Sequence, residues 1–450
     1  MNIIIPEFAL IVLHRLMESG FESYIVGGCV RDSVLGQSPK DYDITTSARP
    51  EEVVGIFESF TVIETGLKHG TVTVMSAGSP VEVTTFRTDG DYLDNRRPSS
   101  VRFCGTLRED LSRRDFTCNA IAYSPQSGII DYFGGLSDIE NKIIRAVGNP
   151  RRRFEEDSLR ILRAMRFSSR LGFEIDRQTS DDMHLCRSLL SNISGERIFA
   201  ELSGILMGEN AREIILQYHD ILSEFIPSFS DMAGFRQNNP YHIYDVLTHT
   251  AVAVERAEPR LCVRLAALLH DVGKPACYFE DADGVGHFYG HAEESVQIAR
   301  EVFRRLPTDN FTKERVIKLI KYHDAPISPD HKQIKRMLLR HGEEFVSDLI
   351  ELEKADALAQ SPEYHERIDR LRECGAMLRE IVEQNECFSL RRLAIGGRDV
   401  ISLGVPSGKR VGEILTALLS MVVEEKVSNT PDKLREAAIG LIEAEEQSDG

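Results

Sequence analysis

The stretch GGCVRDSVLGQSPKDYDITT, residues 27–46, decides the fold of the first part of the chain. Gly27 and Gly28 follow the β-type run YIV and precede a predicted helix that contains Arg31. Glycines at a strand-to-helix turn let backbone N–H groups approach an anion closely. The segment therefore predicts a phosphate-binding turn, and a plain tight turn is the alternative.

Two carboxylates follow on the next predicted strand. Asp41 and Asp43 stand two residues apart, so on a strand their side chains point to the same face. Such neighbours repel each other unless cations lie between them, and Mg²⁺ prefers oxygen ligands. The pair predicts a site for two Mg²⁺ ions, the arrangement that promotes phosphoryl displacement. Glu82, in the predicted strand VEVTTF, is the candidate third catalytic carboxylate; a surface glutamate on an edge strand is the alternative.

The distribution of residue types predicts an α/β part followed by helical parts. Four runs rich in β-branched residues, YIVGG, DYDITT, GTVTVM and VEVTTF, predict a mixed sheet with helices. After residues 148–150 the apolar residues recur at helical spacing, as at Leu159, Leu162 and Met165. The 450 residues are enough for several domains. We predict an α/β head (1–145), a helical neck (146–230), a helical body (231–365) and a helical tail (366–450), with turn-rich stretches at 227–240, 281–290 and 394–408.

The charge distribution points to one basic region on an acidic protein. A formal net charge of −17 argues against a nucleic-acid partner, because phosphate binding depends largely on Lys and Arg. Basic residues nevertheless gather between residues 145 and 170, and Arg96, Arg97, Arg113 and Arg114 form a second group. A nucleic-acid phosphate is therefore expected to meet a basic neck.

Other features narrow the class of protein. The eight cysteines include no CxxC pair, which argues against a zinc knuckle or a disulfide framework. No segment approaches the ~20 apolar residues of a membrane span, and the start, MNIIIPEFALIVL, has no basic leader and no cleavage site. We expect a cytoplasmic protein with no membrane partner, and no obligate protein partner is evident.

Four ordered motifs resemble one enzyme family. They are GGCVRD, DYDITT, RRDFTCNAIAY (113–123) and EEDSLRILRAMRF (155–167). Together they resemble the class II tRNA nucleotidyltransferase and poly(A) polymerase family. The resemblance implies a polymerase-β-like head, a neck, body and tail that hold the acceptor arm and 3′ end of tRNA, and template-independent addition of CCA from CTP and ATP.

The resemblance also implies roles for individual residues. Asp157 and Arg160 would hydrogen-bond the Watson–Crick edge of the incoming base, and Glu156 would orient Arg160. On one helix these three side chains would share a face; a solvated ion pair is the alternative. Asp115 would check the ribose 2′-hydroxyl and Arg114 would hold the triphosphate, or this segment is only a basic surface turn. The complete nucleotide-binding set is Gly28, Arg31, Arg114, Asp115, Glu156, Asp157, Arg160 and Arg163.

Residues 88–103, TDGDYLDNRRPSSVRF, form a polar stretch that we expect to be mobile. It resembles the flexible loop of enzymes that finish with A, which favours CCA or A addition over CC addition alone. Residues 389–419 resemble a tRNA-binding tail, with a helix–loop–helix cap as the alternative. Three rival functions stay open: an A-adding enzyme, a poly(A) polymerase, which the acidic end LIEAEEQSDG disfavours, and an HD-type phosphohydrolase of signalling nucleotides whose head only binds nucleotide as a regulator.

A second constellation lies in the predicted body. The order of His249, the His270–Asp271 pair that closes LCVRLAALLHDVGKP (261–275), and Asp356 resembles the HD phosphohydrolase superfamily. His291 and His323 would complete a two-metal set; buried core histidines are the alternative. Mixed nitrogen and oxygen ligands suit Mn²⁺, Ni²⁺, Fe²⁺ or Zn²⁺ as well as Mg²⁺. The implied activity is hydrolysis of 2′,3′-cyclic or terminal phosphates on damaged tRNA ends.

Overall fold

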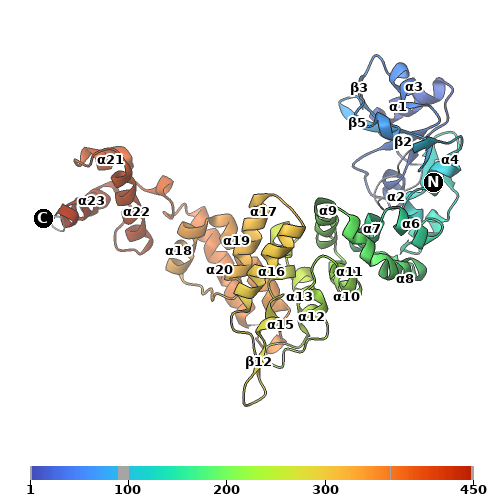
Figure 1. Ribbon diagram of the computed structural model, residues 1–450. Helices are drawn as coiled ribbons and strands as arrows, with labels where there is room; N and C mark the ends of the chain where they lie inside the picture. The colour runs from blue at the N-terminus through green and yellow to red at the C-terminus, as the bar shows by residue number, and fades with distance from the viewer. Residues whose placement is uncertain (1–2, 90–100, 365, 447–450) are drawn as a thin grey trace. The chain divides into compact units, whose positions relative to one another are not determined.

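The computed structural model describes residues 3–89, 101–364 and 366–446 (Figure 1). The chain divides into two compact units. Unit 1 comprises residues 1–230 and 302–308, and unit 2 comprises residues 231–301 and 309–450. Two helices, α12 (Phe229–Met232) and α16 (His291–Arg305), contain residues of both units. The finer division into four parts stays a prediction.

A mixed sheet of seven strands forms the core of the first part of unit 1, as predicted. The strand order is β3-β4-β5-β2-β1-β8-β9, with β2 and β5 parallel and the other described neighbours antiparallel. The strands are β1 (Ser23–Val26), β2 (Asp43–Thr46), β3 (Thr61–Ile63), β4 (Thr71–Ser76), β5 (Ser79–Thr85), β8 (Ile121–Ser124) and β9 (Gly128–Asp131).

Short helices surround this sheet. Helix α1 buries Val12, Leu13 and Leu16, and it contacts β1, β4 and β5. Burial of such an apolar stripe is what holds an amphipathic helix on a sheet. The helices are α1 (Glu7–Glu18), α2 (Gly28–Val34), α3 (Pro50–Ile56), α4 (Leu107–Ser112) and α5 (Gly135–Glu140), with 3₁₀ turns η1 (Leu67–His69) and η2 (Thr117–Asn119).

The predicted loop at residues 88–103 is not entirely loop. Its ends form an antiparallel pair, β6 (Arg87–Asp89) and β7 (Val101–Phe103), in which Arg87 pairs with Phe103. Backbone pairing therefore orders both ends, which polar composition did not indicate. Residues 90–100, including Arg96 and Arg97, lie outside the described residues, so the expected mobility of the loop stays a prediction.

The rest of unit 1 is helical, as predicted, and Leu159, Leu162 and Met165 are buried. One expectation was wrong: residues 155–167 do not form a continuous helix. Helix α6 ends at Glu156, Asp157 is extended (φ −139°, ψ 100°), and α7 begins at Leu159. The elements are α6 (Pro150–Glu156), α7 (Leu159–Leu171), α8 (Arg177–Cys186), η3 (Arg187–Asn192), α9 (Gly195–Leu206), α10 (Ala211–Gln217), α11 (His219–Leu222), β10 (Ile143–Ile144) and β11 (Glu174–Ile175).

The break between α6 and α7 has a local cause. The Asp157 Oδ1 atom accepts a hydrogen bond from the backbone N–H of Leu159 at 3.2 Å. An aspartate that bonds the backbone two residues ahead competes with the helical hydrogen-bond pattern. The side chain of Asp157 therefore helps to begin α7 and does not lie on a helix face.

Unit 2 is built almost entirely of helices. Helices α13, α14, α17 and α19 pack on one another, and α20 packs on α19. The helices are α13 (Val246–Arg256), α14 (Leu261–Leu269), α15 (Lys274–Cys277), α17 (Asn310–Tyr322), α18 (His331–His341), α19 (Glu343–Leu358), α20 (Glu366–Glu383), α21 (Gly397–Ser402), α22 (Lys409–Val423) and α23 (Pro431–Glu446). The 3₁₀ turns are η4 (Pro362–Tyr364) and η5 (Leu390–Arg392).

All three stretches predicted as turn-rich contain some regular structure, and the short helix α12 lies within residues 227–240. A small antiparallel hairpin, β12 (Phe279–Glu280) and β13 (Gly286–His287), enters residues 281–290, and α21 lies within residues 394–408. In α14 every residue from Val263 to Leu269 is buried, so this helix is the centre of the helical core. No helix among the described residues is long and apolar enough to cross a membrane.

Candidate active site and a second polar cluster

The glycine turn lies where the sequence predicts it. Strand β1 ends at Val26, and α2 begins at Gly28. Gly27 has a φ of 85°, which L-residues rarely adopt, and a Cβ there would lie 2.9 Å from Nη1 of Arg114. The backbone conformation therefore favours glycine at position 27, and the absence of a side chain there lets Arg114 lie against the turn.

Three carboxylates gather beside this turn. Asp43 begins β2 and pairs with Val26 on one side and, in the parallel register, with Glu82 of β5 on the other. Asp41 lies just before the strand and is exposed. Burial raises the pKa of Asp43, Arg114 lowers it, and Glu82 and Asp41 raise it again, so that the pKa lies at about 6. The repulsion expected from the sequence is therefore present, and divalent cations would relieve it.

A polar cavity of about 590 Å³ opens on these residues. It is bounded by carboxylates on one part of its wall and by guanidinium groups on another, so it can hold cations and phosphates together. The predicted residues that line it are Gly28, Arg31, Asp41, Asp43, Arg114, Asp115 and Arg163. Glu82 is not among the lining residues. Lining residues that the sequence did not single out include Lys40, Asn119, Arg166, Phe167 and Arg170.

A smaller cavity of about 260 Å³ adjoins the first. It is lined by Asp157 and Arg160, the predicted base-reading pair. Both cavities share Arg114, Asp115 and Arg163. The residues predicted to read the base and those predicted to hold the metal ions thus border two cavities of unit 1 that have three lining residues in common.

Asp115 is fixed by its neighbours. Its Oδ2 atom accepts hydrogen bonds from Nε and Nη2 of Arg163 at 2.9 and 2.6 Å, and its Oδ1 atom accepts one from Asn119 at 3.1 Å. Burial would raise the pKa of Asp115, but Arg163 outweighs it and the pKa falls to about 2. Asn119 also accepts a hydrogen bond from Arg31 at 2.7 Å. Asn119 lies four residues after Asp115, and this spacing is the feature of the sequence that could have indicated their contact.

The predicted base-reading pair is held from several sides. Arg160 is 7% exposed; its Nη1 atom lies 3.3 Å from Oε2 of Glu156, and its Nη2 atom donates to the backbone oxygen of Arg113 at 2.9 Å. The Oδ2 atom of Asp157 lies 3.5 Å from Nη2 of Arg197 on α9. Such anchoring fixes the direction in which both side chains face the cavity. Nothing in the local sequence indicated Arg197.

Several arginines of the larger cavity stack on one ring. The guanidinium carbons of Arg31, Arg163 and Arg166 lie 5.2, 5.4 and 4.7 Å from the ring centroid of Phe167. An aromatic face attracts cations at this distance, so Phe167 helps to hold the group in place. Fixed cations of this kind suit a triphosphate.

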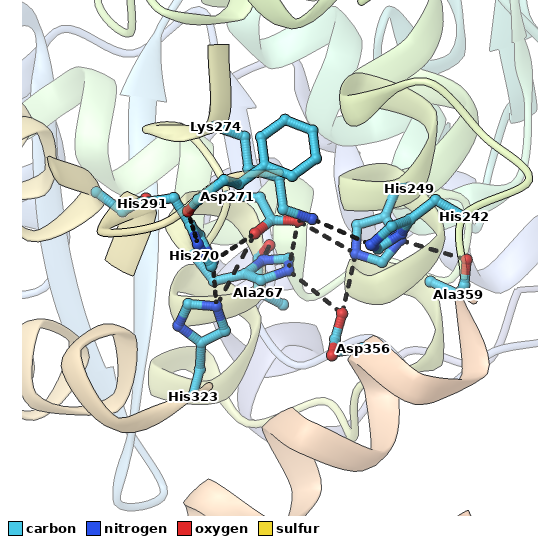
Figure 2. A network of polar contacts seen from close by, with 12 residues as sticks. His242, His249, Ala267, His270, Asp271, Lys274, His291, His323, Asp356 and Ala359 are labelled. Carbon is cyan, nitrogen blue, oxygen red and sulfur yellow. Dashed lines mark hydrogen bonds and ion pairs between the residues drawn. The ribbon is translucent and has the colours of Figure 1, made fainter. Parts of the chain in front are cut away.

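The six predicted metal ligands of unit 2 converge, although they come from five elements (Figure 2). His249 lies on α13, Asp356 on α19, and His270 and Asp271 follow α14. The Nε2 atoms of His249 and His270 lie 3.3 and 3.2 Å from Oδ2 of Asp271. The Nε2 atom of His249 also lies 3.0 Å from Oδ1 of Asp356. We call these four residues the first half of the cluster.

The second half is formed by His291, which begins α16, and His323, which follows α17. Their Nε2 atoms lie 3.1 Å apart and face Oδ1 of Asp271 at 3.5 and 3.9 Å. Asp271 thus directs one carboxylate oxygen to each half (Figure 2). This geometry suits two neighbouring cations that share a bridging carboxylate.

Hydrogen bonds select one tautomer of all four histidines. Each Nδ1 atom faces a backbone carbonyl oxygen, those of Ala359, Ala267, Phe288 and Ile320. A carbonyl only accepts, so Nδ1 carries a proton in each ring and Nε2 is the atom directed at the carboxylates. A nitrogen lone pair and a carboxylate oxygen repel each other unless a proton or a metal ion lies between them. The donor set therefore fits divalent metal ions.

The charges of the cluster agree with this geometry. Burial lowers the pKa of His323 to about 3, which keeps its ring neutral. Burial opposes ionisation of Asp271, but His270 and Lys274 hold its pKa well below the usual range. The ammonium of Lys274 lies 2.7 Å from Oδ2 of Asp271 and offsets part of the negative charge. Burial lowers the pKa of His270, but Asp271 and Asp356 outweigh it and raise the pKa to about 10, so a proton holds the place between these groups that a divalent ion would take.

Comparison with known proteins gives the class of this chain. The Poly A polymerase head domain family matches residues 23–145, and the family described as the probable RNA and SrmB-binding site of polymerase A matches residues 172–232. A third family, tRNA nucleotidyltransferase domain 2 (putative), matches residues 290–438. With the site in unit 1, these matches define a nucleotidyltransferase of the poly(A) polymerase type.

Full-length relatives define the family more narrowly. The CCA-adding enzyme of Lactobacillus johnsonii is 35% identical over 431 residues, 95% of this chain and 96% of the relative. That of Lactobacillus helveticus is 34% identical over 427 residues, 95% of both chains. The crystal structure of the Bacillus stearothermophilus CCA-adding enzyme in complex with CTP is 29% identical, with a TM-score of 0.71 over 98% of both chains. The chain belongs to the CCA-adding enzyme family.

Proposed function

We propose that this chain adds CCA to the 3′ end of tRNA, using CTP and ATP in the cavities of unit 1. The observation that carries the proposal is the shared wall of the two cavities, since Arg114, Asp115 and Arg163 border both. A nucleotide with its base beside Asp157 and Arg160 would extend its triphosphate toward Asp43. Family membership over 95% of the chain supports the same function.

The carboxylates beside the glycine turn are proposed to hold two Mg²⁺ ions. Asp41 and Asp43 would be ligands, and Glu82, the register partner of Asp43, would be the third carboxylate. Ions bound there would neutralise the triphosphate and activate the tRNA 3′-hydroxyl. Arg31, Arg114 and the cations around Phe167 would hold the triphosphate oxygens, and Asp115 would accept from the ribose 2′-hydroxyl. Positioning and fixed charge thus supply most of the rate.

The selection of C and A is proposed to depend on two different side chains, a carboxylate that accepts hydrogen bonds and a guanidinium that donates them. The Asp157 carboxylate accepts from the exocyclic amine that cytosine and adenine share, and the Arg160 guanidinium donates to ring acceptors. U and G lack a donor at that position, so they would leave the carboxylate unpaired, which is costly in a buried site. The bonds from Glu156 and the Arg113 carbonyl keep Arg160 in one orientation.

The proposal is tested with tRNAs that end before CCA, after C and after CC. Each is incubated with labelled CTP or ATP, and the products are separated on a sequencing gel. We expect two C additions and then one A. Incorporation of A alone, on the CC-ending tRNA, would instead identify an A-adding enzyme. Long A tracts on unrelated RNA ends would identify a poly(A) polymerase. Protein with Asp41→Asn and Asp43→Asn is the inactive control.

A second activity is favoured by the cluster in unit 2. We propose that residues 231–365 form an HD-type phosphohydrolase, in which His249, His270, Asp271, His291, His323 and Asp356 hold two divalent ions, Mn²⁺ and Ni²⁺ being candidates. The convergence of the ligand atoms supports this proposal, because the potential ligand atoms of His249, His270 and Asp271, and those of Asp271, His291 and His323, lie within 4.8 Å of one another. Bound ions would activate water toward a 2′,3′-cyclic or terminal phosphate of an RNA end.

This second proposal is tested with an RNA that ends in a 2′,3′-cyclic phosphate, in the presence of Mn²⁺ or Ni²⁺. We expect the wild-type protein to open the cyclic phosphate and the His270→Ala/Asp271→Ala protein to lose this activity. Hydrolysis that persists at the wild-type rate in the double variant would exclude the cluster as its source. A thermal unfolding curve of the same preparation checks that unit 2 of the variant is folded.

A further inference from the structure

Asp356 uses its two carboxylate oxygens for different purposes. Its Oδ1 atom faces Nε2 of His249 at 3.0 Å and Nε2 of His270 at 3.7 Å, in the first half of the cluster. Its Oδ2 atom faces the other way and accepts hydrogen bonds from Nη1 of Arg367 at 2.8 Å and from Nε2 of Gln360 at 3.3 Å. One oxygen is therefore presented to the histidines while the other is engaged by the protein.

Arg367 lies on α20, outside the helices that carry the six ligands. Its guanidinium forks between two acids of α19, because Nη1 binds Asp356 and Nη2 lies 3.2 Å from Oε2 of Glu353. Glu353 and Asp356 are three residues apart and so share a helix face, and they are 2% and 6% exposed. The planar fork of arginine fits two fixed acceptors, whereas the single ammonium of lysine does not.

The terminal torsion of an aspartate is soft, so without a partner the plane of the carboxylate can rotate until neither oxygen is directed at the histidines. We infer that Arg367 is a positioning residue for the proposed metal site, because its guanidinium fixes Oδ1 of Asp356 toward the first half of the cluster. The inference rests on the proposed second activity, and it adds a residue that orients a ligand without itself binding the metal ion. Residues that orient ligands in this way change metal affinity by about 10- to 100-fold when removed.

The position of Arg367 makes its effect selective. It bonds Asp356 of the first half, while the second half, His291 and His323, faces Oδ1 of Asp271 and has no contact with Asp356 in the described hydrogen bonds and ion pairs. A residue that only neutralised buried acids would disturb α19 and α20 generally. A positioning residue would weaken one ion and leave the other unchanged, which separates the two roles.

The test is isothermal titration calorimetry of metal-free protein with Mn²⁺ at fixed pH. We expect two ions in the wild-type protein. In Arg367→Met one of them binds about 10- to 100-fold more weakly and the other as in wild type, and Arg367→Lys lies between. His323→Gln identifies the ion of the second half of the cluster, because this substitution should weaken the binding of the ion whose affinity Arg367→Met leaves unchanged. Arg372→Met is the matched control, because Arg372 lies on the same helix, pairs with Asp369 at 2.8 Å and has a 64% exposed side chain.

A double variant covers the case in which Arg367→Met unfolds the protein. In Arg367→Met/Glu353→Gln the excess buried negative charge is reduced, and thermal unfolding without metal reports the restored stability. Weak binding of one ion in this stable double variant supports the inference. Restored wild-type affinity, or equal weakening of both ions, overturns it and leaves Arg367 a structural role.

The remaining outcomes separate this inference from the proposal beneath it. Wild-type protein that binds no Mn²⁺ overturns the metal site and the role of Arg367 together. If the wild-type protein binds two ions and the Arg367→Met protein binds both with the same affinities, the positioning role of Arg367 is overturned and the metal site is retained.

Discussion

Arg160 shows how a single side chain is prepared for its role. It is buried, and its two terminal nitrogens are directed by Glu156 and by the carbonyl of Arg113. The motif indicated Glu156 because the two residues are four apart on the chain. The Arg113 carbonyl, 47 residues away, could not be anticipated, because the contact exists only after the head and the following helices have packed.

The same limit applies to other residues of the two sites. Asp41, Asp43 and the six proposed ligands of unit 2 could be named from the sequence, because their residue types and their spacing along the chain indicate metal binding. Arg197 and Arg367 have no such signal: each is an ordinary arginine on a helix surface until folding brings it to Asp157 or Asp356. Supporting residues are therefore the part of a site that a single sequence conceals.

Arg160→Met is expected to weaken both correct nucleotides. The loss of charge-assisted hydrogen bonds should lower kcat/KM for CTP and ATP about 10- to 100-fold. Single-nucleotide incorporation assays give these values for all four nucleotides. Arg177→Met, which removes a 96% exposed side chain, serves as control. Unchanged kcat/KM for CTP and ATP would show that Arg160 does not contact the base.

At the scale of elements, the sheet and most helices followed from composition and periodicity, but the break at Asp157 did not. The run EEDSLRILRAMRF has helical spacing throughout, so periodicity alone predicts one helix. The contrary signal was Asp157-Ser158 before an apolar run, a typical helix start. The parallel pairing that sets Glu82 beside Asp43 was equally hidden, because strand order depends on contacts distant in sequence.

Two substitutions at Asp157 separate its structural role from its proposed role in base selection. Asparagine keeps an oxygen that accepts from the Leu159 N–H but offers donors where the carboxylate only accepts. Asp157→Asn should therefore unfold at the wild-type temperature and lose discrimination against UTP and GTP. Asp157→Ala should lose discrimination and also about 1 kcal/mol of stability. Thermal unfolding and incorporation assays give both readouts, and wild-type discrimination by Asp157→Asn would contradict the proposal.

At the scale of the whole molecule, the two polar clusters lie in different compact units. The net charge of −17 hides the cations around the cavities of unit 1, which is why composition alone gave the wrong indication about a nucleic-acid partner. Only local charge, read motif by motif, indicated the basic region. The number of compact units and their discontinuous boundaries could not be derived from turn-rich stretches.

Separate units predict separable activities. Asp41→Asn/Asp43→Asn should lower CCA addition at least about 100-fold and leave hydrolysis of the cyclic phosphate unchanged. His270→Ala/Asp271→Ala should do the reverse. Both assays are run on both variants, with metal present in excess. Parallel loss of the two activities in either variant would show that the clusters form one functional site.

The function proposed for unit 1 requires that one nucleotide contact both Asp43 and the Asp157–Arg160 pair. A crystal structure with CTP and Mn²⁺, with the ions located by anomalous scattering, measures this directly. We expect Mn²⁺ between Asp41, Asp43 and the triphosphate, with the cytosine edge against Asp157 and Arg160. Mn²⁺ bound away from both aspartates, or a cytosine that does not reach residues 157 and 160, would contradict it.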